Sequence, residues 1–313
     1  MQKIHSFGSY LQRLREEKEI TQSFIADSLH IAEKTYRRIE KDKAIPRIEI
    51  LEKMSLIFKE DLVLSFVKYN SQGMEMFEKI KEDIDRKIIQ DNYDKLNESI
   101  PRLKALIETI KNPYYILQYR QYVLLIEGSA VYREGANYYK SIEMTTKGIL
   151  LSNENFSIDQ YKDFSYSPME LRLLMNIAFS IYRIGDREKY FEIMDFIMGE
   201  VDHGDKIYPI IAYNLGTAYK RLEKYSRAIE YMVKGIKYCK DQSEFSMLPL
   251  LYYGQGVSEY YLNRENYKNS FKKAVSLTEL LGYNDLKISM TGKCNNNFQY
   301  NVDKEMRSFF DKE

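Results

Sequence analysis

The sequence predicts an all-α protein, with a small N-terminal helical domain followed by an α-solenoid of helical hairpins. Three observations support this fold class. Apolar and small residues recur every three or four positions through most of the chain, which is the spacing of one buried helix face. Proline and glycine, which interrupt helices, are scarce, with 6 and 14 in 313 residues. A pattern of two paired helices also repeats along the C-terminal two thirds.

The clearest copy of this pattern predicts helices over about 210–222 and 226–239. Three small residues, Gly216, Ala228 and Gly235, lie on their apolar faces. Two helix backbones approach closely only where side chains are short, so these positions predict tight antiparallel packing. A single hairpin of this kind leaves one apolar face uncovered, which favours stacking of further copies.

Further copies precede and follow this hairpin. Two lie upstream, one lies downstream, and a weaker one covers about 77–108. The residues in register are Ser141 with Ala228, Gly148 with Gly235, Asn176 with Asn214, and Tyr267 with Tyr225. The pattern resembles the tetratricopeptide repeat, with about five repeats over 77–282 and longer loops than usual between them.

Composition excludes several classes of protein. Hydrophobic residues make up 44% and charged residues 30%, which is typical of a soluble globular chain. The net charge of +1 gives no overall attraction to nucleic acid, so any such attraction is local. Two cysteines, Cys239 and Cys294, provide no disulfide framework. The absence of a signal peptide and of a long apolar span leads us to expect a cytoplasmic protein without membrane contact.

The first sixty residues predict a compact helical domain. A helical stripe over 6–17 precedes a short helix that ends near Ser28, and a turn over 29–31 leads to a helix over 33–40. Pro46 interrupts the chain before another helix over 48–58. Two short helices joined by a turn of this length describe a helix-turn-helix.

The residues of this region resemble the Xre, or phage-repressor, type of DNA-binding domain over about residues 6–66. The resemblance is carried by Leu14, Arg15, Lys18, Thr21, Gln22, Ile25, Ala26, Leu29, Ile31, Thr35, Tyr36, Arg38, Ile39, Glu40 and Pro46. It implies base reading by Glu33, Lys34, Arg37 and Arg38, with Thr35 as a further candidate. It implies phosphate contacts by Gln22, Lys41 and Lys43. It also implies an internal ion pair between Arg15 and Glu40.

The local charge agrees with this implication. Residues 34–47 carry six cations against Glu40 and Asp42. Cations of this kind neutralise DNA phosphates, and arginine in the major groove reads guanine. Three residues depart from the family pattern: His30 and Asp42 stand where glycine is usual, and Ala32 replaces a capping Ser or Thr. A helix-turn-helix that serves protein contact instead of DNA stays open as an alternative.

The remaining boundaries follow from composition. We expect the DNA-binding domain at 1–66, a connector at 67–76, repeats at 77–282 and capping helices at 283–313. The apolar stretch after Asp61 is either the last helix of the domain or a dimer seam. The sequence gives no role to Cys294 or to the asparagines at 295–297.

This order of domains resembles the intracellular peptide-pheromone receptors of Gram-positive bacteria, the Rgg, PlcR and PrgX type. The resemblance implies a quorum-sensing transcriptional regulator that binds double-stranded DNA as a homodimer. It also implies a short signalling peptide in the concave groove of the repeats. No enzyme activity, cofactor or metal is expected.

The candidate peptide-binding residues lie on the first helix of each repeat. Asn176 and Asn214 are equivalent, and an asparagine side chain can bond both the donor and the acceptor of an extended peptide. Helix capping or a solvated face is the alternative role for this pair, and inter-helix filling is the alternative for the 28 tyrosines. The other candidates are Arg133, Arg172, Phe179, Arg183, Tyr213, Thr217, Lys220, Tyr252, Gln255 and Glu259.

Two other functions compete with this reading. The repeats of a protein-interaction adaptor would hold a protein partner. A dimeric DNA-binding repressor would use its repeats only to dimerise and would take no peptide. Substitution of the recognition helix distinguishes the adaptor from the other two, because only the adaptor would keep its function.

Overall fold

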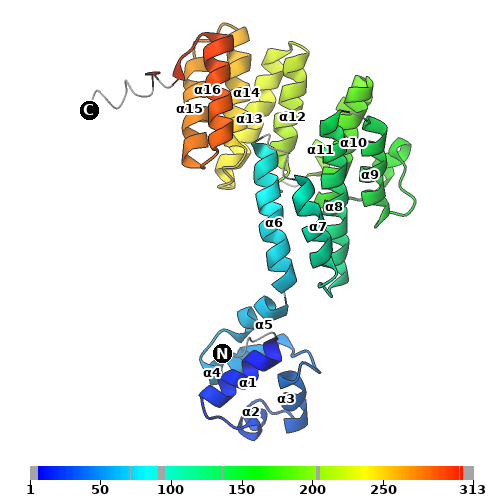
Figure 1. The fold of residues 1–313 in the computed structure, drawn as a ribbon, viewed down its shortest axis with the longest axis vertical. Helices are drawn as coiled ribbons and strands as arrows, with labels where there is room; N and C mark the ends of the chain where they lie inside the picture. Colours follow the sequence, from blue (N-terminus) through cyan, green and yellow to red (C-terminus); the bar gives the residue numbers. More distant parts are fainter. Residues whose placement is uncertain are drawn as a thin grey trace. The chain divides into compact units, whose positions relative to one another are not determined.

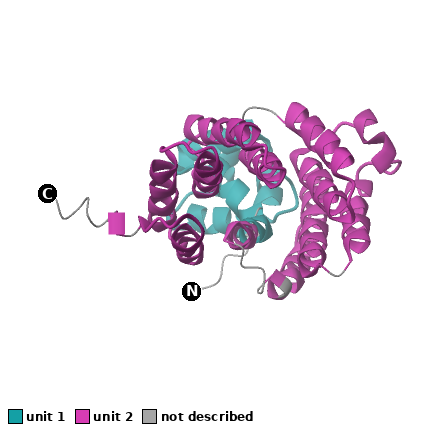
Figure 2. Cartoon of the chain, turned by 90° about the horizontal axis from the view of Figure 1, so that it is seen from above, with its two compact units in different colours: residues 1–78 teal, residues 79–313 magenta. Residues whose placement is uncertain are grey.

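The computed structural model describes residues 6–70, 72–90, 96–135, 137–201, 205–302 and 304–305, and these ranges contain helices and no strands. The chain divides into two compact units, Met1–Glu78 and Lys79–Glu313 (Figure 2). Each unit contains its own buried apolar residues. Within the described ranges, the helices are too short or too polar to cross a membrane.

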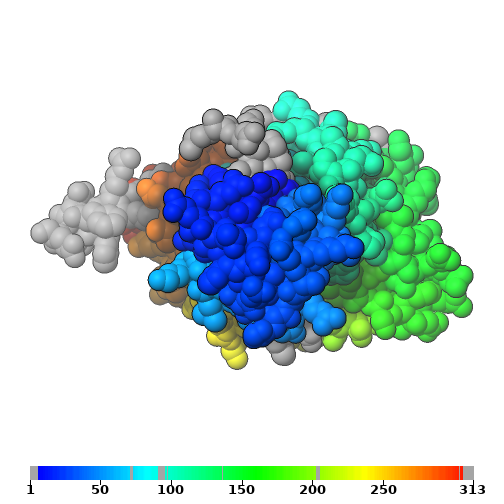
Figure 3. Space-filling model, turned by 90° about the horizontal axis from the view of Figure 1, so that it is seen from below, coloured from blue at the N-terminus to red at the C-terminus, as the bar shows by residue number. Residues whose placement is uncertain are grey.

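Unit 1 begins with the compact helical domain expected from the sequence. Its helices are α1 (Phe7–Glu17), α2 (Gln22–Ser28), α3 (Glu33–Glu40), α4 (Ile48–Phe58) and α5 (Leu62–Asn70). Their apolar faces form one core, in which Leu11, Ile25, Tyr36 and Met54 are buried. The side chain of Thr21 caps α2 by accepting a hydrogen bond from the Phe24 amide. Figure 3 shows the surface of this part of the chain in blue.

Gly8 lets α1 reach the end of α3. A Cβ atom at this position would lie 2.4 Å from the carbonyl oxygen of Glu40. The amide of Gly8 donates a hydrogen bond of 2.8 Å to the Asp42 carboxylate. The first helix therefore fixes the backbone just after α3, which helps to orient the exposed face of that helix.

The departures from the family pattern are visible in the backbone. His30 and Asp42 both adopt left-handed conformations, with φ of 53°. Such angles favour glycine, which has no Cβ to collide with the following carbonyl. Ala32 begins α3 without a side-chain hydrogen bond to the first turn.

Replacing His30 with glycine should stabilise unit 1 by about 1 kcal/mol, because glycine relieves the left-handed strain. Hydrogen exchange of α2 and α3 in the full chain measures this gain. The variant His30→Ala is the matched control, since it removes the imidazole and keeps the Cβ. If alanine stabilised as much as glycine, the imidazole would be the cause and the backbone explanation would be wrong.

The region after α5 differs from the expected connector at 67–76. Helix α6 runs over Gln72–Ile89, so helix begins within that range and continues past the boundary between the units. The weak repeat copy expected over about 77–108 corresponds to the end of α6 and to α7 (Leu96–Ile107). Residues 91–95 of that copy, Tyr93 among them, lie outside the described residues. Helix α7 packs on the helix that follows it in the chain. In the described ranges, α6 and α7 do not pair along their length as the two helices of the later hairpins do.

The rest of unit 2 is a stack of successive helical hairpins (Figure 1). Each hairpin contributes a first and a second helix, and neighbouring hairpins pack on each other. The helices are α8 (Pro113–Glu134), α9 (Tyr138–Leu150), α10 (Pro168–Ile184), α11 (Arg187–Glu200), α12 (Tyr208–Arg221), α13 (Tyr225–Asp241), α14 (Leu248–Tyr261) and α15 (Tyr267–Leu280). The predicted all-α fold, with its repeat-like body, is confirmed.

Small residues let these helices pack closely, as the sequence pattern predicted. A Cβ on Gly216 would lie 3.1 Å from the carbonyl oxygen of Ala228 on the paired helix. Between hairpins, a Cβ on Gly235 would lie 2.7 Å from Leu251, and one on Gly148 would lie 2.8 Å from Leu173. Gly235 and Gly148 therefore occupy equivalent packing positions in two copies of the hairpin.

Long connections account for part of the irregular repeat spacing. Residues 151–167 separate α9 from α10 and contain a short 3-10 helix, η1 (Ile158–Asp163). Tyr161 of this segment is buried, and its hydroxyl has no hydrogen-bond partner among the described residues. The segment is thus packed on the stack, which the sequence did not predict.

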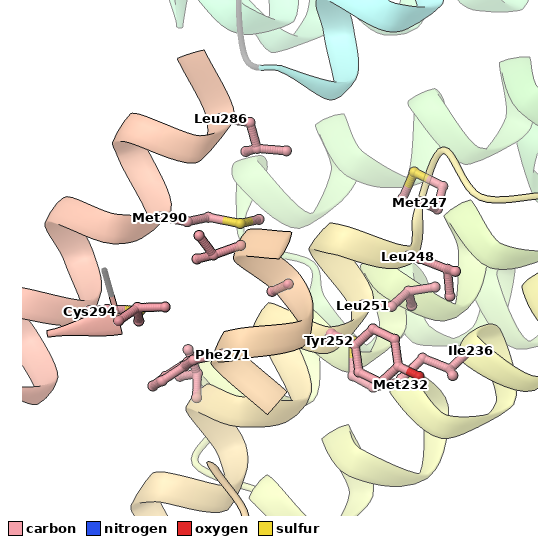
Figure 4. Close-up of a cluster of buried hydrophobic side chains, with 14 of the residues drawn as sticks. Met232, Ile236, Met247, Leu248, Leu251, Tyr252, Phe271, Leu286, Met290 and Cys294 are labelled. Carbon is pink, nitrogen blue, oxygen red and sulfur yellow. The ribbon is translucent and has the colours of Figure 1, made fainter. Parts of the chain in front are cut away.

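Helix α16 (Asn284–Phe298) follows the last hairpin and covers its apolar face (Figure 4). Met290, Cys294 and Phe298 are buried in the same cluster as Phe271 of α15. Cys294 therefore has a packing role, whereas the asparagines at 295–297 are exposed. Cys239 is also a buried free thiol, and burial raises its pKa to about 12. Residues 306–313 of the expected cap lie outside the described residues.

Candidate nucleic-acid interface and ligand-binding face

Helix α3 divides into a buried and an exposed face. Tyr36, Ile39 and Glu40 are buried against the rest of the domain, and burial raises the pKa of Tyr36. The opposite face is exposed and rich in cations. Exposed side chains on and after the helix are Lys34, Thr35, Arg37, Arg38, Lys41 and Lys43.

The cations of this face differ in their own contacts. Arg37 pairs with Glu33 at 2.6 Å, four residues away on the same helix. Arg38 donates to the carbonyl of Lys43 at 3.3 Å, beyond the end of the helix. Lys34, Lys41 and Lys43 have no acidic partner among the described residues. The face therefore offers unpaired positive charge, while Glu33 partly neutralises Arg37.

A buried network ties α1, α2 and α3 together. Glu40 is 5% exposed and accepts hydrogen bonds of 2.6 Å from Arg15 and from Gln22. The hydrogen bond that Arg15 donates to the Glu40 carboxylate raises the pKa of Arg15. The ion pair implied by the Xre resemblance is present. The amide nitrogen of Gln22 is used inside the domain, so its role in phosphate binding stays a prediction.

The two equivalent asparagines lie in the same way on α10 and α12. Asn176 donates to the carbonyl of Arg172, and Asn214 donates to the carbonyl of Ile210, each four residues earlier. The other end of the Asn176 amide accepts from Ser129 of α8 at 3.0 Å. The register of the copies is thus visible in their hydrogen bonds. Peptide binding by this pair stays a prediction.

An aromatic and cationic cluster lies at the ends of α8 and α10. The Phe179 ring is 6.3 Å from the Tyr132 ring. Arg183 donates to the Tyr138 hydroxyl at 3.0 Å, and its guanidinium lies over that ring. Arg133 is exposed at the end of α8.

On α12, Tyr213, Thr217 and Lys220 lie one turn apart and are all partly buried. The Thr217 hydroxyl is buried without a hydrogen-bond partner in the described part of the chain. Burial and the positive charges of Arg221 and Lys293 lower the pKa of Lys220 to about 8. The sequence reasoning missed Arg221 and Lys293 as members of this group.

Three of the predicted peptide-binding residues on α14 contribute to contacts within unit 2. Glu259 is buried and accepts from Ser270 of α15 and from Gln255 at 2.7 Å each. Tyr252 is 8% exposed, with the ammonium groups of Lys240 and Lys273 over its ring. These contacts occupy the Glu259 carboxylate, and its peptide contact remains untested.

Arg172 has an unexpected partner. It pairs with Asp85 of α6 at 2.9 Å, and its guanidinium lies over the Tyr122 ring of α8. The Tyr122 hydroxyl is also 3.3 Å from the Asp85 carboxylate. The Arg172 side chain is therefore already paired with a residue of α6. No spacing rule pointed to Asp85, because α6 does not repeat the hairpin pattern.

Surface hollows do not coincide with the predicted peptide-binding set. One of about 590 Å³ lies beside the turn between α12 and α13, lined by residues that include Tyr219, Tyr225 and Arg227. Another of about 320 Å³ lies beside α7 and α8 and includes Lys104, Val123 and Leu151 in its lining. None of the predicted peptide-binding residues lines either hollow.

Comparison with known proteins defines the class. Residues 11–64 match a helix-turn-helix family model, which spans α2 to α4 and parts of the flanking helices. The N-terminal unit thus contains a helix-turn-helix domain of the Xre type. No curated protein matches the chain.

Solved structures extend the similarity to nearly the whole chain. PlcR of Bacillus thuringiensis, solved with the peptide PapR7 and DNA, has a TM-score of 0.66 and 18% identity, with 92% of this chain and 99% of PlcR covered. ComR of S. thermophilus, solved with DNA and its signalling peptide ComS, has a TM-score of 0.54 and 14% identity, with 92% and 98% covered. PrgX in complex with cCF10 has 0.52 and 15%, with 92% and 98% covered. The chain therefore has the fold of PlcR, ComR and PrgX.

Proposed function

We propose that this protein is a cytoplasmic, dimeric transcription regulator that binds operator DNA through α3 and a short signalling peptide on its repeats. The observation that carries the DNA half is the exposed face of α3. Its cations lie on one side of a helix whose other side is fixed in the core. A helix of this kind enters the major groove, with cations on phosphates and base edges. The peptide-binding part of the proposal is supported by PlcR and ComR, which were solved with peptides and whose fold covers 92% of this chain.

Apolar side chains on unit 1 support a dimer. Helix α5 packs on the core through Leu62, which is fully buried. Leu64 and Val67 of the same helix are 66% and 55% exposed, and Leu56 of α4 is 80% exposed. Exposed apolar residues on neighbouring helices suit contact with a second copy. The apolar stretch is thus the expected last helix, and it also offers a dimer seam.

The pair between Arg172 and Asp85 suggests how a peptide signal would reach the DNA-binding unit. Helix α6 continues from unit 1 into unit 2, and Asp85 holds it to α8 and α10. An acidic or polar peptide group that engaged Arg172 would compete with Asp85. Such competition would weaken the ion pair that attaches α6 to α10. The first residues of α6 belong to unit 1. A ligand shifts an equilibrium only through contacts that differ between the two states.

The double substitution Lys34→Ala with Arg38→Ala should weaken operator binding at least about a hundredfold, because each base-edge or phosphate contact contributes about 1–3 kcal/mol. The operator is first selected from random duplexes with the wild-type protein. Fluorescence anisotropy at fixed salt then measures affinity.

The control for this experiment is Lys53→Ala, which removes an exposed cation from α4. It should bind the selected duplex about as tightly as the wild type. If the double variant kept wild-type affinity, α3 would not be the recognition helix. Wild-type protein that selected no duplex but bound a protein partner, with that binding unchanged in the double variant, would favour the adaptor function instead.

A further inference from the structure

The inference rests on the proposed DNA-binding function and concerns how α3 reads a base. It starts from Arg37, whose side chain is 53% exposed on α3. Two hydrogen bonds hold its guanidinium group. The Nη2 group donates to the Glu33 carboxylate at 2.6 Å, and the Nε group donates to the side-chain carbonyl of Gln22 at 3.3 Å. Glu33 lies one turn earlier on α3, whereas Gln22 begins α2, so the arginine is held from two helices.

The side chain of Gln22 is in turn held by the core of the domain. Its amide nitrogen donates to Glu40 at 2.6 Å. Glu40 is 5% exposed and also pairs with Arg15 of α1 at 2.6 Å. A carboxylate only accepts hydrogen bonds and a guanidinium only donates them, so these two partners allow one orientation of the amide between them. The exposed end of Arg37 is thus connected to the buried core through one side chain.

The other cations of this face are held less firmly. Arg38 makes one hydrogen bond, from Nη2 to the Lys43 carbonyl at 3.3 Å, just after the helix. Lys34 makes no ion pair with a described carboxylate. A long side chain that is free before binding loses rotamer freedom when it makes a contact, and this loss weakens binding. Arg37 has already lost much of that freedom, which suits a contact that requires exact geometry.

The two contacts leave one edge of the Arg37 guanidinium open. Nε and Nη2 form one edge of this planar group, and Nη1 with the second hydrogen of Nη2 forms another. In the described ranges, the hydrogen bonds of Arg37 use Nε and Nη2 and leave Nη1 without an acceptor. The open edge therefore presents two parallel N–H donors. In the major groove guanine presents two neighbouring acceptors, N7 and O6, whereas adenine presents an acceptor beside a donor.

We propose that Arg37 reads a guanine of the operator through this open edge, and that Gln22 and Glu33 position it. This role of Gln22 differs from the phosphate contact that the Xre resemblance implies. The negative charge of Glu33 beside the guanidinium weakens the attraction of Arg37 for phosphates. The arrangement therefore favours recognition of one base over general attraction to DNA.

Selection of random duplexes by the full-length protein tests the base preference. The wild type should select a sequence with a guanine whose replacement by adenine weakens binding at least about tenfold. Replacement of the same guanine by 7-deazaguanine, which lacks only the N7 acceptor, should weaken binding about threefold or more. Arg37→Lys keeps the charge but lacks the planar fork, so it should bind these three duplexes about equally well.

Glu33→Ala and Gln22→Met test the positioning role from two sides. Each should lower the preference for guanine over adenine about threefold or more, because one orienting hydrogen bond is lost. Glu33→Ala should at the same time bind random duplex at least as tightly as the wild type, since it removes a negative charge. In the Arg37→Lys background neither substitution should change the base preference further, because the fork that they position is gone.

The two positioning variants differ in their effect on the fold. Gln22→Met removes a hydrogen bond from the buried Glu40 carboxylate, whereas the Glu33 side chain is 43% exposed. Glu33→Ala therefore tests the role without disturbing the core. The matched control is Arg13→Ala, which removes the arginine of another exposed pair with i, i+4 spacing, on α1. It should keep the wild-type base preference.

The possible failures are distinguishable. A wild type that selects no duplex would overturn DNA binding and this inference together. A selected sequence without a guanine preference, or with one that persists in Arg37→Lys, would overturn base reading by Arg37 and leave DNA binding standing. An unchanged guanine preference in Glu33→Ala would overturn the positioning role.

Discussion

Replacing Arg15 with methionine should destabilise unit 1 by about 3 kcal/mol or more. The reason is that Glu40 would stay buried after losing its charged partner, and breaking a buried pair from one side typically costs 3–5 kcal/mol. The side chain of Glu40 is 3% exposed and that of Arg15 is 15% exposed, so water replaces the lost contact poorly. Hydrogen exchange of α1 to α3 in the full chain measures the loss.

Arg13→Met is the matched control on the same helix. Arg13 pairs with Glu17 at 3.4 Å, but both side chains are about half exposed. Surface pairs contribute at most about 1 kcal/mol, so this variant should change stability little. Adding Glu40→Gln to Arg15→Met should recover part of the loss, because the remaining buried group is then neutral. Equal effects of Arg13→Met and Arg15→Met would show that burial of the pair does not matter.

The second large effect concerns Lys220 and pH. Burial and the charges of Arg221 and Lys293 lower its pKa to about 8 in the folded chain, below the ordinary value of about 10.4. Below pH 8 both states carry the proton, and the folded state bears the full cost of the charge. Between about pH 8 and 10.4 the folded lysine is neutral while the unfolded one stays charged, so the cost disappears as pH rises.

Lys220→Met removes this cost at every pH. The variant should therefore be more stable than wild type by about 2 kcal/mol at pH 7, and the gain should shrink towards pH 10.4. Urea unfolding at a series of pH values measures the difference in unfolding free energy between the variant and the wild type. The many tyrosines titrate in both proteins, so their contribution cancels in this difference. Lys237→Met should give a difference that does not vary with pH. A gain from Lys220→Met that stayed constant from pH 7 to 10.4 would contradict the lowered pKa.

These two effects bear differently on function. The pair between Arg15 and Glu40 fixes the domain that presents α3, so its loss weakens DNA binding through folding. Lys220 lies on α12 in the other unit, so the pH effect expected there reports on the helical repeats and leaves the DNA-binding domain unchanged.

The helix-turn-helix was predictable in detail because its contacts are local. Its helices begin and end within a residue or two of the predicted positions, since capping, apolar spacing and Pro46 act over a few residues. The ion pair between Arg15 and Glu40 was predictable because both residues are positions of one specific sequence motif. The packing role of the hairpin glycines was equally predictable, because Gly148 and Gly235 each face a leucine of the next hairpin.

The ligand-binding face was less predictable. A helical period shows which residues share one side, but not which of them a neighbouring element will use. Gln255 and Glu259 lie at the predicted spacing on α14, yet Ser270 of α15 holds Glu259 inside the hairpin. Spacing predicted Arg172 for this face, but its partner Asp85 comes from a helix outside the repeat pattern.

The sequence by itself determined an all-helical chain, the helix-turn-helix with its cationic face, and the register of the hairpins. Each of these depends on residues within one or two turns, or on a motif that repeats. Only the tertiary structure decided that α6 pairs with Arg172 and that Ser129 of α8 holds Asn176 of α10. Those contacts join positions dozens of residues apart, and long-range packing, which no local spacing encodes, brings them together.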